Sequence, residues 1–167
     1  LVQCHPICSH ADVYDLPHTG GEDSGELRRS IETEGMRAWS HKTIWQRLDV
    51  EHSPKGLVKW VEGQVARASP TTVLALRPRV GKWTQAVTDR LSKINTPALL
   101  LLAEKSRSST PYQVEYMARV MPRAKLVTLP GIGNGMWLLK PEWCVKQMRQ
   151  FLSGLTRESA RARGRTP

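Results

Sequence analysis

The beginning of the chain has a short apolar stretch followed by a long polar one. Residues 1–5 are mostly apolar and end at Pro6, which predicts a strand that stops before the proline. From Pro6 to Ser24 the composition turns to His, Asp, Gly and Pro. Such a composition predicts a loop.

The next part of the chain has helical periodicity. Residues 26–48 are predicted to be helical in two pieces with a hinge near Gly35, and a further helical stretch is expected between Thr71 and Leu91. Between them, Ser53-Pro54 is expected to begin a helix, with serine as the N-cap and proline as its first residue. That helix has an apolar face at helical spacing, made by Leu57, Val58, Val61 and Val65.

The pattern changes again after Ile94. Residues 97–103 form a continuous apolar run of strand length, which is typical of a strand buried on both faces of a parallel sheet. Thr110-Pro111 predicts a helix start, and residues 125–129 predict a second strand. The helix between these strands has an apolar stripe of Val114, Met117, Ala118 and Met121. The order strand, helix, strand predicts a βαβ unit.

The chain closes with a glycine-rich loop and a last helix. The loop covers residues 130–135, and Pro141 is expected to begin the helix. From Thr156 the chain carries four arginines among Ser, Ala and Gly, which predicts a basic, disordered tail over residues 156–167.

Composition and charge narrow the class of protein. The 167 residues are 40% hydrophobic and 24% charged, which fits a globular core, and the longest apolar run is far shorter than the roughly 20 residues of a membrane helix. The net charge of +10 is uneven, because residues 1–53 sum to −4 and residues 54–167 to +14. The basic part indicates either a solvated surface or an anionic partner. Three cysteines are too few for a disulfide framework, which favours the cytoplasm.

Residues 94–155 resemble the C-terminal end of an α/β-hydrolase. The matching segments read INTPALLLLAEKS, STPYQVEYMARVMPRAKLVTLPGIGN and KPEWCVKQMRQFL. The resemblance implies that residues 1–5 are the strand after the nucleophile elbow, and that residues 6–93 are a loop and a helical cap. Gly35-Met36-Arg37-Ala38, followed by Arg47, is similar to the caps of 3-oxoadipate enol-lactonases.

The same resemblance implies a Ser-His-acid triad, which this chain lacks. No G-x-S-x-G elbow occurs in the sequence, and because the chain begins at Leu1 without an initiator Met, we expect the elbow upstream. The acid position falls at Ser106 and the histidine position at Asn134. Neither side chain can take and return a proton near neutral pH. An acid after the earlier strand, Asp12 or Asp15, remains an alternative.

Three other groups of residues have a candidate function beside a structural one. The glycines of the 130–135 loop either cradle a phosphate or form a turn, and Met136 stands where a dinucleotide fingerprint needs a third glycine. Trp39 and Trp45 either line an apolar pocket or pack within the cap. The cluster of Cys4, Cys8 and His10 is a possible zinc site, although no second C-x-x-C pair completes it.

We therefore expect an α/β protein with a partial α/β-hydrolase fold, a short parallel sheet with flanking helices, and a helical cap. Its intact relatives would hydrolyse carboxylic esters or lactones, small apolar substrates, without a cofactor; this chain alone would be inactive. The alternative is a non-catalytic binding module whose basic surface engages an anionic partner such as RNA. A homo-oligomer formed through an open sheet edge is also possible. No membrane association is expected.

Overall fold

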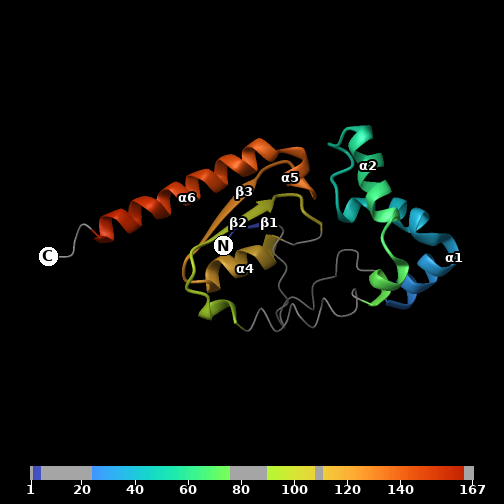
Figure 1. The fold of residues 1–167 in the computed structure, drawn as a ribbon, viewed down its shortest axis with the longest axis horizontal. Helices are drawn as coiled ribbons and strands as arrows, with labels where there is room; N and C mark the ends of the chain where they lie inside the picture. Colours follow the sequence, from blue (N-terminus) through green and yellow to red (C-terminus); the bar gives the residue numbers. More distant parts are fainter. Residues whose placement is uncertain (1, 5–23, 76–89, 108–110, 164–167) are drawn as a thin grey trace.

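The computed structural model describes residues 2–4, 24–75, 90–107 and 111–163. These residues form a sheet with helices on both sides and, beside it, a separate group of helices (Figure 1). The elements in chain order are β1 (Val2–Cys4), α1 (Ser24–Lys42), η2 (Ile44–Gln46), α2 (Lys55–Ala66), η3 (Leu91–Lys93), β2 (Ala98–Ala103), α4 (Pro111–Val120), β3 (Ala124–Leu129), α5 (Met136–Leu139) and α6 (Pro141–Arg163).

The sheet is parallel, with the strand order β1-β2-β3. The central strand β2 is buried at all six positions, so the predicted strand buried on both faces is confirmed. Its side chains alternate between two cores. Leu100 and Leu102 pack on Val114 and Met117 of α4, whereas Leu99 and Leu101 pack toward α5 and α6. This division follows from the two-residue period of a strand.

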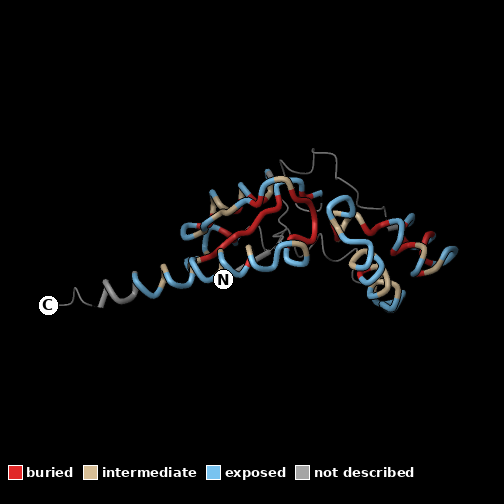
Figure 2. Tube along the Cα trace, turned by 90° about the horizontal axis from the view of Figure 1, so that it is seen from above, coloured by how far each residue is buried: buried red, intermediate tan, exposed pale blue. Residues whose placement is uncertain are grey.

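The helices on the two faces begin where the sequence predicts. α4 begins at Pro111 and α6 at Pro141. The predicted end of α6 was wrong: a disordered tail was expected from Thr156, and the helix continues to Arg163. Arg and Ala, which are good helix formers, dominate this last stretch and explain the extension. Figure 1 shows that this end of α6 extends away from the sheet, and Figure 2 shows that the strands of the sheet are mostly buried.

Residues 24–75, which we refer to as the helical unit, form a second group. α1 has a kink at Gly35, where φ is 83°, as the sequence predicts. α2 begins at Lys55 with Pro54 as its N-cap, one residue later than predicted. The predicted apolar face of α2 is divided between two clusters: Val65 packs against α1 residues, and Leu57, Val58 and Val61 pack with Ile44 and Leu48.

Residues 2–4, 90–107 and 111–163 are here called the sheet unit. Among the described residues, the helical unit contacts the sheet unit along one line of contacts, here called the seam. Leu139 of α5 packs on the cluster around Leu48, and the backbone N–H of Asp49 donates to the carbonyl oxygen of Asn134 at 2.7 Å. The predicted boundaries at residues 5 and 93 stay predictions, because residues 5–23 and 76–89 lie outside the described ranges. Within those ranges, no helix is both long and apolar enough to cross a membrane.

Candidate functional site

Ser106 and Asn134 lie together at one edge of the sheet. Ser106 is in the turn after β2, and Asn134 is in the loop after β3. Because β2 and β3 are neighbouring parallel strands, the loops at their carboxyl ends meet. The amide of Lys105 donates to the carbonyl of Ile132 at 2.9 Å, which joins the two loops directly.

The two side chains are joined by a buried hydrogen bond. The Ser106 hydroxyl donates to Oδ1 of Asn134 at 3.0 Å, and the exposed fractions of the two residues are 8% and 2%. Oδ1 also accepts the backbone N–H of Arg107 at 3.0 Å, and Nδ2 donates to the carbonyl of Trp45 at 3.0 Å. The amide of Asn134 therefore links both loops and the helical unit.

This pair cannot carry out the proton transfers that a serine hydrolase needs. A histidine base takes the proton of the nucleophile and returns it, and an acid holds the resulting imidazolium. A carboxamide neither gains nor loses a proton near neutral pH, and a hydroxyl carries no charge to stabilise a cation. What the Ser106–Asn134 pair does offer is a fixed, buried polar contact.

The glycine-rich loop uses its amides to bind carboxylates. The N–H of Gly131 donates to Glu104 at 2.6 Å, and that of Gly133 donates to Asp49 at 2.7 Å. A phosphate would have to displace both carboxylates to reach these donors. The phosphate-cradle alternative therefore has no support here, whereas Gly131 and Gly135 have positive φ, as turn glycines do.

Gly135 has a second role, because the helical unit approaches it closely. A Cβ added at Gly135 would lie 2.8 Å from Cδ1 of Leu48 and 2.9 Å from the carbonyl oxygen of Arg47. A side chain at this position would push the seam apart. The seam beside Asn134 thus depends on a residue without a Cβ.

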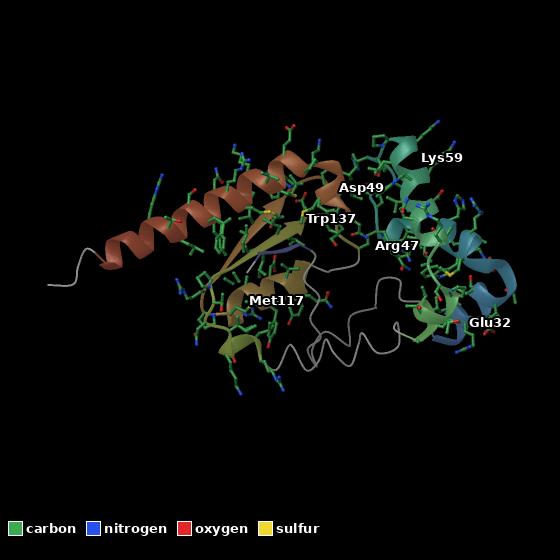
Figure 3. All side chains as sticks on the ribbon, viewed as in Figure 1. Glu32, Arg47, Asp49, Lys59, Met117 and Trp137 are labelled. Atoms are coloured by element: carbon green, nitrogen blue, oxygen red, sulfur yellow. The ribbon has the colours of Figure 1, made fainter. Side chains whose placement is uncertain are left out.

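Asp49 and His52 form a carboxylate–imidazole pair that the sequence analysis missed. Nδ1 of His52 lies 2.9 Å from Oδ2 of Asp49, the same oxygen that accepts the Gly133 amide. Burial alone would raise the pKa of Asp49, but the hydrogen bonds from Gly133 and His52 outweigh it and hold that pKa below its usual value. Figure 3 shows Asp49 at the seam between the two units. A D-x-x-H spacing is the only sequence signal for this pair.

Trp39 and Trp45 are engaged in packing. The Arg47 guanidinium lies 4.7 Å from the ring centroid of Trp39, which is 2% exposed, and the Arg107 guanidinium lies 4.7 Å from that of Trp45. Both are cation–π distances. This supports the packing interpretation of these tryptophans over a substrate pocket.

The remaining candidates lie outside what the structure describes. Cys8, His10, Asp12 and Asp15 belong to the undescribed residues 5–23, and the side chain of Cys4 is not described. Among the described residues, no group of three His, Cys, Asp or Glu side chains could hold a metal ion. The zinc site and the relocated acid therefore stay predictions.

This chain is similar to a protein family and to several solved structures. A family model described as TAP-like protein matches residues 77–162. No curated protein matches the sequence. A thermophilic esterase from Thermogutta terrifontis is similar in structure, with a TM-score of 0.72 and 18% identity, over 92% of this chain and 55% of the esterase.

Two further solved structures are similar. The enol-lactonase from Burkholderia xenovorans LB400 has a TM-score of 0.67 and 15% identity, over 76% of this chain and 48% of the lactonase. MGS-M2, an α/β-hydrolase enzyme from a Medee basin deep-sea metagenome library, has a TM-score of 0.65 and 17% identity, over 91% of this chain and 55% of that enzyme. The chain thus spans about half the length of the solved structures it matches.

Proposed function

Because this chain belongs to the TAP-like protein family and has the fold of α/β-hydrolases, we propose that it is the cap and C-terminal part of a carboxylic ester or lactone hydrolase. We further propose that the chain has no hydrolase activity of its own. The helical unit would be the cap. An esterase and an enol-lactonase among the similar structures support this substrate class.

The Ser106–Asn134 hydrogen bond is the observation that carries the proposal. The family resemblance assigns the acid and the histidine to these two positions, and an acid and a histidine must touch for a triad to work. The two side chains do touch, at 3.0 Å. Their chemistry is wrong for proton transfer, so the contact would be retained as structure while the catalytic groups have been replaced.

The first experiment measures turnover. We expect the chain to hydrolyse p-nitrophenyl butyrate and δ-valerolactone no faster than a protein-free blank. The Asn134→Ala and His52→Gln variants serve as controls. Hydrolysis above the blank would contradict the proposed inactivity. A loss of that hydrolysis in one variant would locate it at Asn134 or at the Asp49–His52 pair.

The second experiment tests whether positions 106 and 134 are the acid and histidine positions. We would introduce Asn134→His alone and together with Ser106→Asp, and follow the new imidazole by NMR. A carboxylate in contact stabilises the imidazolium, so the pKa should be about one unit higher in the double variant. Lys105→Asp with Asn134→His is the matched control, because residue 105 is exposed. An equal rise in that control would contradict the assignment.

A cytoplasmic location belongs to the same proposal. Three cysteines in 167 residues are too few for a disulfide framework, which fits a reducing compartment. Thiol labelling of protein purified without reductant checks this. Fewer than three labelled cysteines after denaturation would indicate a disulfide and contradict it.

The alternative function is binding of an anionic partner such as RNA. It is favoured by the +14 net charge of residues 54–167. An electrophoretic shift assay with single-stranded RNA over a salt titration distinguishes it from the first proposal, because phosphate contacts give a steep salt dependence. Absence of a shift at low salt would remove this alternative.

A further inference from the structure

A groove between α1 and α2 is lined by basic residues and an exposed tryptophan. Its volume is about 370 Å³, within the range of small-molecule sites. The lining residues of α2 recur at spacings of three and four positions, as residues on one helix face do. We refer to the following lining residues as the basic groove: Arg37, Lys59, Trp60, Gly63, Gln64, Ala66 and Arg67.

Among the described residues, three cations and no carboxylate line this groove. None of the lining residues is acidic, and the neighbouring acids are engaged elsewhere: Glu62 lies 2.8 Å from Nδ1 of His41, and Glu34 pairs with Lys42. Within the described ranges, Arg37, Lys59 and Arg67 take part in no ion pair. Like charges gathered at one site repel each other unless an anion lies between them.

An exposed indole stands among these cations. Trp60 is 55% exposed, whereas Trp39 on the neighbouring helix is 2% exposed. A tryptophan left open to solvent keeps a large flat apolar surface available for stacking. Figure 3 labels Lys59, its neighbour in the sequence, on α2.

One lining residue of the groove is a glycine that packing does not require. Gly63 lies inside α2, where glycine lowers helix stability relative to alanine. Its backbone is in the helix, and a Cβ added there would meet nothing within 4 Å. A larger residue at this position would fill the groove.

A second groove on the helical unit differs from the basic groove, because its arginine is paired with a carboxylate. It has a volume of about 450 Å³ and is lined partly by Arg28, Glu32 and Leu74. Its arginine is paired, with Nη1 of Arg28 2.9 Å from Oε1 of Glu32. The two grooves are thus similar in size and differ in charge.

We propose that the basic groove binds a small aromatic anion, a planar ring that carries a phosphate or carboxylate group. The ring would stack on Trp60, over the space left by Gly63. The anionic group would be held by the guanidinium groups of Arg37 and Arg67, which bind such oxygens in bidentate fashion, and by the ammonium group of Lys59, which acts as a point charge. This site is separate from the Ser106–Asn134 contact and does not depend on the proposed hydrolase relationship.

The test uses the full chain and three probes in isothermal titration calorimetry. Adenosine 5′-monophosphate carries both ring and phosphate, adenosine the ring alone, and inorganic phosphate the anion alone. We expect the monophosphate to bind about tenfold more tightly than either of the others, with affinity falling as salt rises. Equal binding of the monophosphate and adenosine, or no binding of the monophosphate, would overturn the proposal.

Variants locate the site. Lys59→Gln with Arg67→Gln should lower the affinity for the monophosphate about tenfold or more, and Trp60→Ala should lower this affinity severalfold. Gly63→Leu should abolish binding without lowering the melting temperature, whereas Gly56→Leu, at another open position of α2 outside the groove, should leave binding unchanged. Arg28→Gln, in the second groove, should also have no effect.

Two outcomes would contradict the assignment of the binding site to the basic groove. One is a loss of binding on Arg28→Gln as large as that on Lys59→Gln with Arg67→Gln, which would indicate diffuse surface charge. The other is binding of a single-stranded oligoadenylate with none of the monophosphate, which would assign this surface to nucleic acid.

Discussion

The carboxylate of Asp49 joins two segments that are far apart in the sequence. It accepts the Gly133 amide at 2.7 Å and lies 2.9 Å from Nδ1 of His52. The Asp49 side chain is 11% exposed, so these partners replace most of its water. A buried charge needs such partners, because it is costly to leave unpaired. This one residue therefore contributes to the attachment of the helical unit.

We predict that Asp49→Asn lowers the free energy of unfolding at pH 7 by about 1–3 kcal/mol, since bonds to a charged acceptor are lost. Because the folded-state pKa of Asp49 is lowered below 3.8, its stabilisation is present above that pH and is lost as the pH falls through the folded value. Urea unfolding at pH 7 and at about pH 3 measures this.

The native chain and the Asp49→Asn variant should approach the same stability at the acidic end. Glu32→Gln, in the exposed pair with Arg28, is the control and should have little effect at either pH. A stability difference between the native chain and the Asp49→Asn variant that stays constant with pH would show that the charge of Asp49 does not stabilise the fold.

Among the elements, β2 holds the sheet unit together. It pairs with both other strands, and its side chains supply both cores. A strand of six buried residues between two helical layers can tolerate neither a cavity nor a polar group. The loops that carry Ser106 and Asn134 start from this strand and its neighbour, so the geometry of the site depends on it.

Leu100→Ala should therefore lower the free energy of unfolding by about 2–5 kcal/mol, because Leu100 is fully buried against α4. Leu152→Ala on α6, where Leu152 is 53% exposed, is the matched control and should change it by about 0.5 kcal/mol or less. Guanidinium unfolding followed by circular dichroism compares them. Equal effects of the two substitutions would contradict the assignment of the core.

At the scale of the whole molecule, the sheet has strand edges with a single partner. Among the described strands, β1 pairs with β2 alone and β3 with β2 alone. Unpaired N–H and C=O groups along an edge favour pairing with another chain. The chain spans about half the length of the solved structures of similar fold.

We predict that the chain associates through such an edge and that its apparent mass by light scattering rises with protein concentration. The rise should persist in high salt, because backbone hydrogen bonds and apolar contacts are screened much less than surface charges. A constant monomer mass across the concentration range would contradict the prediction. A mass that falls to the monomer in salt would assign the association to charge.

Local pattern was enough to predict most of the fold. The apolar run of β2, the stripe on α4 and the prolines before α4 and α6 each depend on neighbours within a few residues. The C-terminal end of α6 was predicted too early, because an Arg-rich sequence is compatible with both a solvated tail and a helix. The assignment of Ser106 and Asn134 to the acid and histidine positions stays a prediction from the family resemblance.

Only the tertiary structure decided which polar groups meet. Asp49 and Gly133 are separated by 84 positions, and no periodicity relates them. The same holds for the basic groove, where Arg37 comes from α1 and Lys59 and Arg67 from α2 and its C-cap. Apolar periodicity is a property of one segment, whereas hydrogen bonds and charge clusters depend on how segments are placed against each other. The elements thus follow from local sequence pattern, whereas the packing of the two units brings together the residues of the seam and the groove.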